Sequence, residues 1–136
     1  MQTGRAPIRI LIVDDTPANR RLLVRILERL GHQADEAAGG LEALDLLGRT
    51  EHDLVLLDLQ MPEPDGFETA RRIRAQDPRD IRVLALTGFA EDEVRDACAR
   101  AGIDGIITKP FTIQEIARAI GEVEGGGTRS GPATGA

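Results

Sequence analysis

The sequence contains a single cysteine, three phenylalanines and no tryptophan or tyrosine. The lone Cys98 excludes a disulfide within the chain, and such sparse cysteine fits the reducing cytoplasm. No apolar run approaches the roughly 20 residues that a membrane span requires, and the first residues lack the apolar stretch of a secretion signal. We therefore expect a cytoplasmic protein that does not enter a membrane.

The sequence also lacks an excess of basic residues. Lys and Arg number 17 against 23 Asp and Glu, which gives a net charge of −6 and a pI of about 4.9. An acidic chain of this kind lacks the positively charged surface that binds a phosphate backbone, and no helix-turn-helix segment is evident. We therefore expect no direct nucleic-acid binding. The glycine-rich loops of nucleotide-binding proteins are missing too, because Gly39-Gly40 lacks their spacing. The sequence therefore shows no motif for binding a nucleotide of its own.

What the 136 residues do provide is enough apolar sequence for one globular domain. Hydrophobic residues make up 41% and charged residues 29%, which is ordinary for a folded domain of this size. We expect the domain to cover residues 8–121, after a short extension at 1–7. Residues 122–136 are rich in Gly, Ser, Thr and Pro, and this composition predicts a disordered tail.

Short apolar runs alternate with helical patterns along the domain. Runs of this length, bounded by turn residues, predict strands buried in a parallel sheet. We expect strands at 8–13, 33–37, 54–58, 81–87 and 103–108, and helices at 16–30, 41–47, 67–75, 91–101 and from 112 onward. Five alternations with short connections predict an α/β fold with helices on both faces of the sheet, a three-layer sandwich.

Local signals refine several of these elements. Thr16 is expected to cap the first helix, with Pro17 at its first position, and Thr112 with Glu115 forms the pattern of a capping box. The histidines, His32 and His52, lie beside predicted turns and are expected to be ordinary surface residues. Cys98 is expected to pack on a helix, and Asp65-Gly66 to form a turn and a helix start without a chemical role.

Five polar residues stand where apolar runs end. They are Asp14, Asp15, Asp58, Thr87 and Lys109. Taken singly, each is more typical of a turn or a cap than of a site. Because the carboxyl ends of parallel strands meet at one edge of a sheet, we expect all five in one crevice. Crowded carboxylates raise one another's pKa, and a hard cation such as Mg²⁺, which prefers oxygen ligands, would relieve this repulsion.

The five residues, together with the segments Ile10–Asp15, Asp58–Pro62 and Pro64–Gly66, resemble the receiver domain of two-component response regulators. The likeness extends from about residue 8 to residue 120. It implies a doubly wound, five-stranded parallel sheet of strand order 2-1-3-4-5 flanked by five helices. It also implies phosphorylation on an aspartate by a histidine kinase or a histidine phosphotransfer protein.

The resemblance assigns a role to each site residue. It makes Asp58 the phosphoacceptor, with Thr87 and Lys109 contacting the phosphoryl group and Gly88 leaving room beside it. It implies direct Mg²⁺ ligation, with Mn²⁺ as a possible substitute, by Asp15, Asp58 and the backbone carbonyl of Gln60, and indirect ligation by Asp14 through a water. It also implies a cis Lys109–Pro110 bond. Such a domain transfers a phosphoryl group to itself and loses it slowly, and is not a conventional turnover enzyme.

The first helix is the expected docking site for the phosphoryl donor. It carries a basic stripe of Arg20, Arg21, Arg25 and Arg29. A solvated face is the ordinary reading of such a stripe. In this family, however, histidine-bearing helices dock on the first helix, so the stripe could favour an acidic kinase or phosphotransfer surface. The sequence does not identify the downstream protein target.

The chain departs from the family at two places beside the site. Receivers usually carry Tyr or Phe three residues before the lysine, whereas this chain has Ile106, which cannot swing inward as an aromatic ring does. The usual aromatic readout is therefore not carried over to this chain. Phe89 is bulky for its position, and we predict that Phe89 and Gln60 flank the phosphoryl group and limit the access of water.

Two other function classes remain open. One is a constitutive protein-interaction module of receiver fold that does not depend on phosphorylation. The other, a small Mg²⁺-dependent phosphatase, is less well supported, because no general acid is evident beyond the acidic cluster. A switch could be a free-standing receiver, a phosphorelay shuttle or one domain of a larger regulator.

Overall fold

A computed structural model describes residues 7–76 and 80–126. Five strands alternate with five helices, in the predicted order. The strands are β1 (Arg9–Val13), β2 (Gln33–Ala37), β3 (Leu54–Asp58), β4 (Arg82–Thr87) and β5 (Gly105–Thr108). The helices are α1 (Pro17–Arg29), α2 (Gly40–Arg49), α3 (Gly66–Gln76), α4 (Asp92–Ala101) and α5 (Ile113–Gly126).

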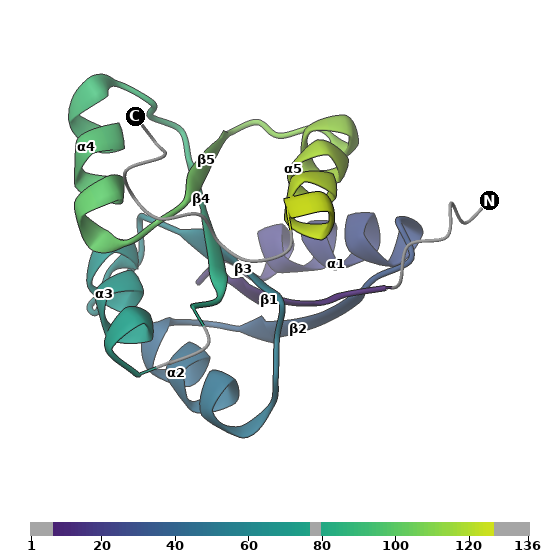
Figure 1. Cartoon of the computed structure of the whole chain (residues 1–136), viewed down its shortest axis with the longest axis horizontal. Coiled ribbons are helices and arrows are strands. Elements are labelled where there is room, and N and C mark those ends of the chain that lie inside the picture. Colours follow the sequence, from purple (N-terminus) through teal and green to yellow (C-terminus); the bar gives the residue numbers. More distant parts are fainter. Residues whose placement is uncertain (1–6, 77–79, 127–136) are drawn as a thin grey trace.

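The strands form one parallel sheet of order β2-β1-β3-β4-β5, which confirms the expected strand order. Helices α1 and α5 cover one face and α2, α3 and α4 cover the other (Figure 1). The order reverses between β1 and β3, which are neighbours although β2 lies between them in sequence. Sites of doubly wound proteins form at this reversal, beyond the carboxyl ends of the strands.

Strands β1, β3 and β4 are largely apolar because both faces of the sheet are covered, whereas the edge strand β2 contains polar residues. In β1, Leu11 and Val13 pack toward α2, α3 and α4, whereas Ile10 and Ile12 pack toward α1 and α5. All five residues of β3 are buried. A polar side chain can therefore avoid the apolar core only where a strand ends, and this explains why the acidic residues gather at the edge.

Of the two capping signals expected at helix starts, one forms as predicted and the other does not. The capping box forms, since the Thr112 N–H donates to Glu115 Oε1 at 2.9 Å and the Glu115 N–H donates to Thr112 Oγ1 at 3.1 Å. The expectation that Thr16 caps α1 is wrong, because its side chain makes no cap hydrogen bond. Its backbone N–H instead donates to Asp14 Oδ1 at 2.8 Å, so an Asx-turn from Asp14 leads into the helix.

The last helix continues past residue 121, where the sequence predicts the end of the domain. Helix α5 continues to Gly126, so disorder is the wrong expectation for residues 122–126. Buried Ile116 and Ile120 anchor the helix, and extending an existing helix is far less costly than starting one. Residues 127–136, the rest of the expected tail, lie outside the described residues, as do residues 1–6 of the expected extension.

The two histidines differ in exposure. The expectation of a surface residue is wrong for His52, which is 2% exposed. Its ring nitrogens lie 2.8 Å from Asp35 Oδ2 and 3.0 Å from the Thr50 carbonyl oxygen, and these partners satisfy a buried imidazole. His32 is half-buried and accepts a hydrogen bond from the Ile8 N–H at 3.1 Å. Cys98 packs on α4 as expected and is 3% exposed.

None of the described helices is both long enough and apolar enough to span a bilayer.

Candidate functional site

Three aspartates meet at the carboxyl edge of the sheet. Because Val13 pairs with Leu57 where β1 and β3 lie side by side, the residues that follow these strands become neighbours. Carboxylate oxygens of Asp14, Asp15 and Asp58 lie within 4.8 Å of one another. Asp14 and Asp58 are buried, while Asp15 is exposed. The predicted acidic cluster therefore forms from the residues expected.

Every polar atom of Asp14 takes part in a hydrogen bond with another residue of the chain. Its N–H donates to the Ala37 carbonyl at 3.1 Å. Its two carboxylate oxygens accept hydrogen bonds from the Thr16 N–H at 2.8 Å and from Asn19 Nδ2 at 3.3 Å, and its carbonyl accepts one from Arg20 Nη1 at 2.7 Å. By contrast, within residues 7–76 and 80–126 the Asp15 carboxylate has no hydrogen-bond or ion-pair partner. Asp15 is thus the more available of the two as a direct ligand.

Asn19 and Arg20 were not identified from the sequence as parts of the site. No sequence pattern singles out Asn19, and Arg20 belongs to the basic stripe by its spacing. Arg20 is largely buried, with its side chain 17% exposed, whereas Arg21, Arg25 and Arg29 are exposed. Their position in the sequence is the one feature that points to this role, because both residues lie in the first turn of the helix that follows the Asp14-Asp15 pair.

Asp58 combines burial with opposing charges. Its Oδ1 accepts a hydrogen bond from the Gln60 N–H at 3.1 Å and lies 3.4 Å from Lys109 Nζ. Burial raises the pKa of the Asp58 carboxyl, and the nearby Asp14 raises it further, while the Gln60 N–H and the Lys109 ammonium lower it. The net effect is a raised pKa. A cation between the carboxylates would stabilise the ionised form.

Thr87 and Lys109 close the other side of the cluster. The Lys109 N–H donates to the Thr87 carbonyl at 2.8 Å, which ties the end of β5 to that of β4. Thr87 is buried, and its Oγ1 accepts a hydrogen bond from the Phe89 N–H at 3.1 Å, so the hydroxyl proton is left to donate elsewhere. The Lys109–Pro110 bond is cis, as expected. A second cis bond, Glu63–Pro64, was not anticipated.

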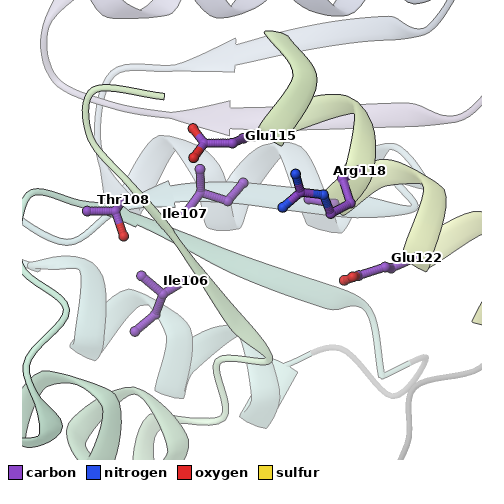
Figure 2. A pocket seen from close by; sticks show the side chains of 7 residues that line it. Ile106, Ile107, Thr108, Glu115, Arg118 and Glu122 are labelled. Atoms are coloured by element: carbon purple, nitrogen blue, oxygen red, sulfur yellow. The ribbon is translucent and has the colours of Figure 1, made fainter. Parts of the chain in front are cut away.

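The residues that flank the site differ in size and exposure. A Cβ added at Gly88 would meet no atom within 4 Å, which agrees with the room expected there. Gln60 is exposed, and the Phe89 residue is 49% exposed. Ile106, which stands where receivers carry an aromatic residue, is half-buried on β5 and lines a hollow of about 210 Å³ beside Thr108 and Arg118 (Figure 2). None of the five predicted site residues lines that hollow.

The chain is similar to known receiver domains over most of its length. A family model described as the response regulator receiver domain matches residues 10–121. Sensor histidine kinase RcsC of Escherichia coli K12 is 40% identical over 107 residues, which are 79% of this chain but 11% of RcsC. Response regulator MprA of Mycobacterium sp. KMS is 40% identical over 110 residues, which are 81% of this chain and 47% of MprA. The chain thus spans less than half the length of these curated relatives.

Among solved structures, the receiver domain of sensor histidine kinase PA1611 from Pseudomonas aeruginosa PAO1 superimposes with a TM-score of 0.81. It is 33% identical, and the match covers 88% of this chain and 99% of that one. A magnesium ion is coordinated in its active site cleft. With the doubly wound sheet and the acidic cluster at its carboxyl edge, these matches show that the chain belongs to the receiver domain family of two-component response regulators.

Proposed function

We propose that this domain is a phosphorylation switch. Asp58 accepts a phosphoryl group from the phosphohistidine of a sensor kinase or phosphotransfer protein, and the phosphorylated domain signals through altered protein contacts. The supporting observation is one arrangement: three carboxylates whose oxygens lie within 4.8 Å of one another, with the Lys109 ammonium 3.4 Å from that of Asp58. Receiver-fold modules that signal by binding alone have no need of such a charge cluster.

The acidic cluster fits Mg²⁺, or Mn²⁺ in its place. Magnesium binds oxygen at about 2.0–2.1 Å with octahedral geometry, so its ligand oxygens lie at most about 4.2 Å apart. Because the carboxylate oxygens already lie within 4.8 Å of one another, small side-chain movements would bring those of Asp15 and Asp58 to these distances. Asp15, Asp58 and the Gln60 carbonyl would hold the ion directly, and Asp14, whose oxygens already accept hydrogen bonds, would hold it through water. When bound, the ion neutralises negative charge on the transferred group.

The chain's own residues supply the remaining chemistry. An Asp58 carboxylate oxygen attacks phosphorus in line, a P–O bond forms, and the P–N bond to the donor histidine breaks with its electron pair leaving on the imidazole. Phosphoryl transfer depends mainly on positioning and charge stabilisation. The Gln60 N–H orients the Asp58 carboxylate, and the Lys109 ammonium lies beside it. The Thr87 hydroxyl donates a hydrogen bond to a phosphoryl oxygen.

Mass spectrometry with a small phosphodonor tests the proposal. Incubation with acetyl phosphate and Mg²⁺ should add about 80 Da to the parent chain and nothing to Asp58→Asn. Asp65→Asn is a matched control, because Asp65 Oδ1 accepts a hydrogen bond from the Glu68 N–H and asparagine caps a helix equally well. This control should gain mass like the parent.

The same experiment distinguishes the phosphorylation switch from the constitutive interaction module. A parent chain that gains no mass from acetyl phosphate or from phosphohistidine, yet binds its kinase or target, would contradict the switch and support the module. Amide chemical shifts on adding beryllofluoride, an analogue of the phosphoryl group, provide a second readout for a chain without tryptophan or tyrosine.

A further inference from the structure

Arg20 makes contacts that set it apart from the other arginines of α1. Its Nη1 donates to the Asp14 carbonyl oxygen at 2.7 Å, and its Nε donates to Glu36 Oε1 on β2 at 3.0 Å. Its side chain is 17% exposed, while Arg21 and Arg25 lie in solvent. The guanidinium therefore joins three elements: the first turn of α1, the end of β1 and the edge strand β2.

We infer that Arg20 is a positioning residue for the acidic segment, holding Asp14 and Asp15 in the orientation that binds the divalent cation. This inference rests on the proposed function. The Asp14 N–H makes the last hydrogen bond to β2, to the Ala37 carbonyl, and its carbonyl then turns to Arg20. The peptide group between Asp14 and Asp15 contains that carbonyl, so any rotation of it redirects the Asp15 side chain.

The fork of the guanidinium suits this role. Nε and Nη1 donate in fixed, divergent directions from one rigid plane, so Glu36 anchors the group while Nη1 holds the carbonyl. A lysine at this position has one nitrogen on a flexible stem and cannot hold both partners in the same geometry. Residues that orient metal ligands from behind in this way strongly affect metal affinity.

A purely electrostatic role for Arg20 predicts the opposite change in Mg²⁺ affinity. A fixed cation near a cation site repels the metal, so if Arg20 contributed only its charge, its removal would strengthen Mg²⁺ binding. Substitution by lysine would then change little, because the charge remains. If Arg20 is a positioning residue, both substitutions weaken binding, so the direction of the change distinguishes the two roles.

Mg²⁺ titration monitored by amide chemical shifts provides the test. Arg20→Lys and Arg20→Gln should each weaken Mg²⁺ affinity about tenfold, the lower end of the range for residues that support metal ligands. Arg49→Gln is the matched control: it removes the same charge from an exposed arginine that pairs with Asp45 at 2.9 Å, and its affinity should stay within about twofold of the parent. Phosphorylation of Arg20→Lys by acetyl phosphate should recover at saturating Mg²⁺, since only the metal requirement has changed.

The possible outcomes are distinct. Mg²⁺ affinity equal to or tighter than that of the parent in the Arg20 variants overturns the inference, as does a maximal phosphorylation rate that excess Mg²⁺ cannot restore. Thermal unfolding of each variant is followed in parallel. Failure of both variants to fold would assign Arg20 to stability and likewise overturn its positioning role. A parent chain that does not bind Mg²⁺ would instead contradict the proposed function.

Discussion

At the scale of single residues, the main feature of the site is the burial of the Asp58 carboxyl, which disfavours its ionised form. Asp58 is 3% exposed, and burial is the largest of the effects that raise the pKa of its carboxyl above the ordinary 3.8. Lys109 and the Gln60 N–H offset part of that cost, and Asp14 adds to it. If this position contributed to stability alone, an uncharged side chain would be favoured there. The buried carboxyl therefore indicates a functional requirement.

The raised pKa of Asp58 predicts how stability depends on pH in the metal-free protein. A carboxyl with a raised pKa in the folded state favours folding below its unfolded pKa, and this contribution is lost as pH rises through the folded pKa. In EDTA at pH 7, Asp58→Asn should therefore have a larger free energy of unfolding than the parent, and the difference should disappear below about pH 3.8. Urea unfolding at several pH values measures this. A less stable Asp58→Asn at pH 7 would contradict it.

Phe89 leads to a second prediction at the scale of single residues. Its backbone N–H is tied to Thr87 Oγ1 at 3.1 Å, and the residue is 49% exposed beside the open position of Gly88. We predict that the Phe89 ring, together with Gln60, shields the aspartyl phosphate from water. Phe89→Ala should then lose its phosphoryl group severalfold faster than the parent, as followed by the decay of the phosphorylated mass. Leu41→Ala, which trims an exposed apolar residue on α2, is the control and should decay at the parental rate.

At the scale of elements, the start of α3 is packed directly against the backbone of Asp58 and Leu59. A Cβ at Gly66 would lie 2.5 Å from Leu59 Cα and 2.6 Å from the Asp58 carbonyl oxygen, and both of these are backbone atoms. The Gly66 N–H also donates to the Leu59 carbonyl at 3.2 Å. The expectation that Asp65-Gly66 is a turn and a helix start is confirmed, but the contact shows that glycine also permits the close approach of helix and strand.

Gly66→Ala should therefore destabilise the domain by about 1–3 kcal/mol, the usual cost of overpacking, and shift the backbone that carries Asp58. Gly48→Ala is the contrasting control. Gly48 lies within α2, where the nearest atom to an added Cβ is Gln76 Nε2 at 3.9 Å. Alanine there should stabilise the domain by about 0.5–1 kcal/mol through helix propensity. Urea unfolding of both variants is the measurement, and equal effects would contradict the packing argument.

At the scale of the whole molecule, the doubly wound sheet separates two helical surfaces. Helices α1 and α5 lie on one face, and α2, α3 and α4 lie on the other. The exposed arginines of α1 that remain after Arg20 turns inward are Arg21, Arg25 and Arg29. They lie on the helix that begins at the acidic cluster, so a partner docked there would reach Asp58. We propose that this surface receives the acidic docking face of the phosphoryl donor.

Charge reversal on α1 tests this docking surface. The double variant Arg21→Glu with Arg25→Glu should slow phosphotransfer from a phosphorylated histidine phosphotransfer protein by about tenfold or more, because like charges suppress association. Phosphorylation by acetyl phosphate should be unchanged. Arg71→Glu with Arg72→Glu is the matched control, since it changes the net charge equally on α3, across the sheet. Equal slowing with both donors, or in both double variants, would contradict the proposal.

The sequence by itself determined the alternation of strands and helices, and with it the edge of the sheet where the five polar residues meet. Burial on both faces makes the strands that precede these five residues apolar runs, so the ends of the runs mark the edge. Asp14, Asp15 and Asp58 could therefore be placed in one cluster before any coordinates were known. The strand order came from the family resemblance, because apolar periodicity reports burial and not which strands are neighbours.

Only the tertiary structure decided which side chains hold that cluster in place. Arg20 is indistinguishable from Arg21 by residue type, and the difference arises because β2 lies beside β1 and brings Glu36 within 3.0 Å of Nε. His52 is buried for a similar reason, through its contact with Asp35 on β2. Such contacts join residues far apart in the chain, and they form only once the strands are paired, so no local pattern of the sequence records them.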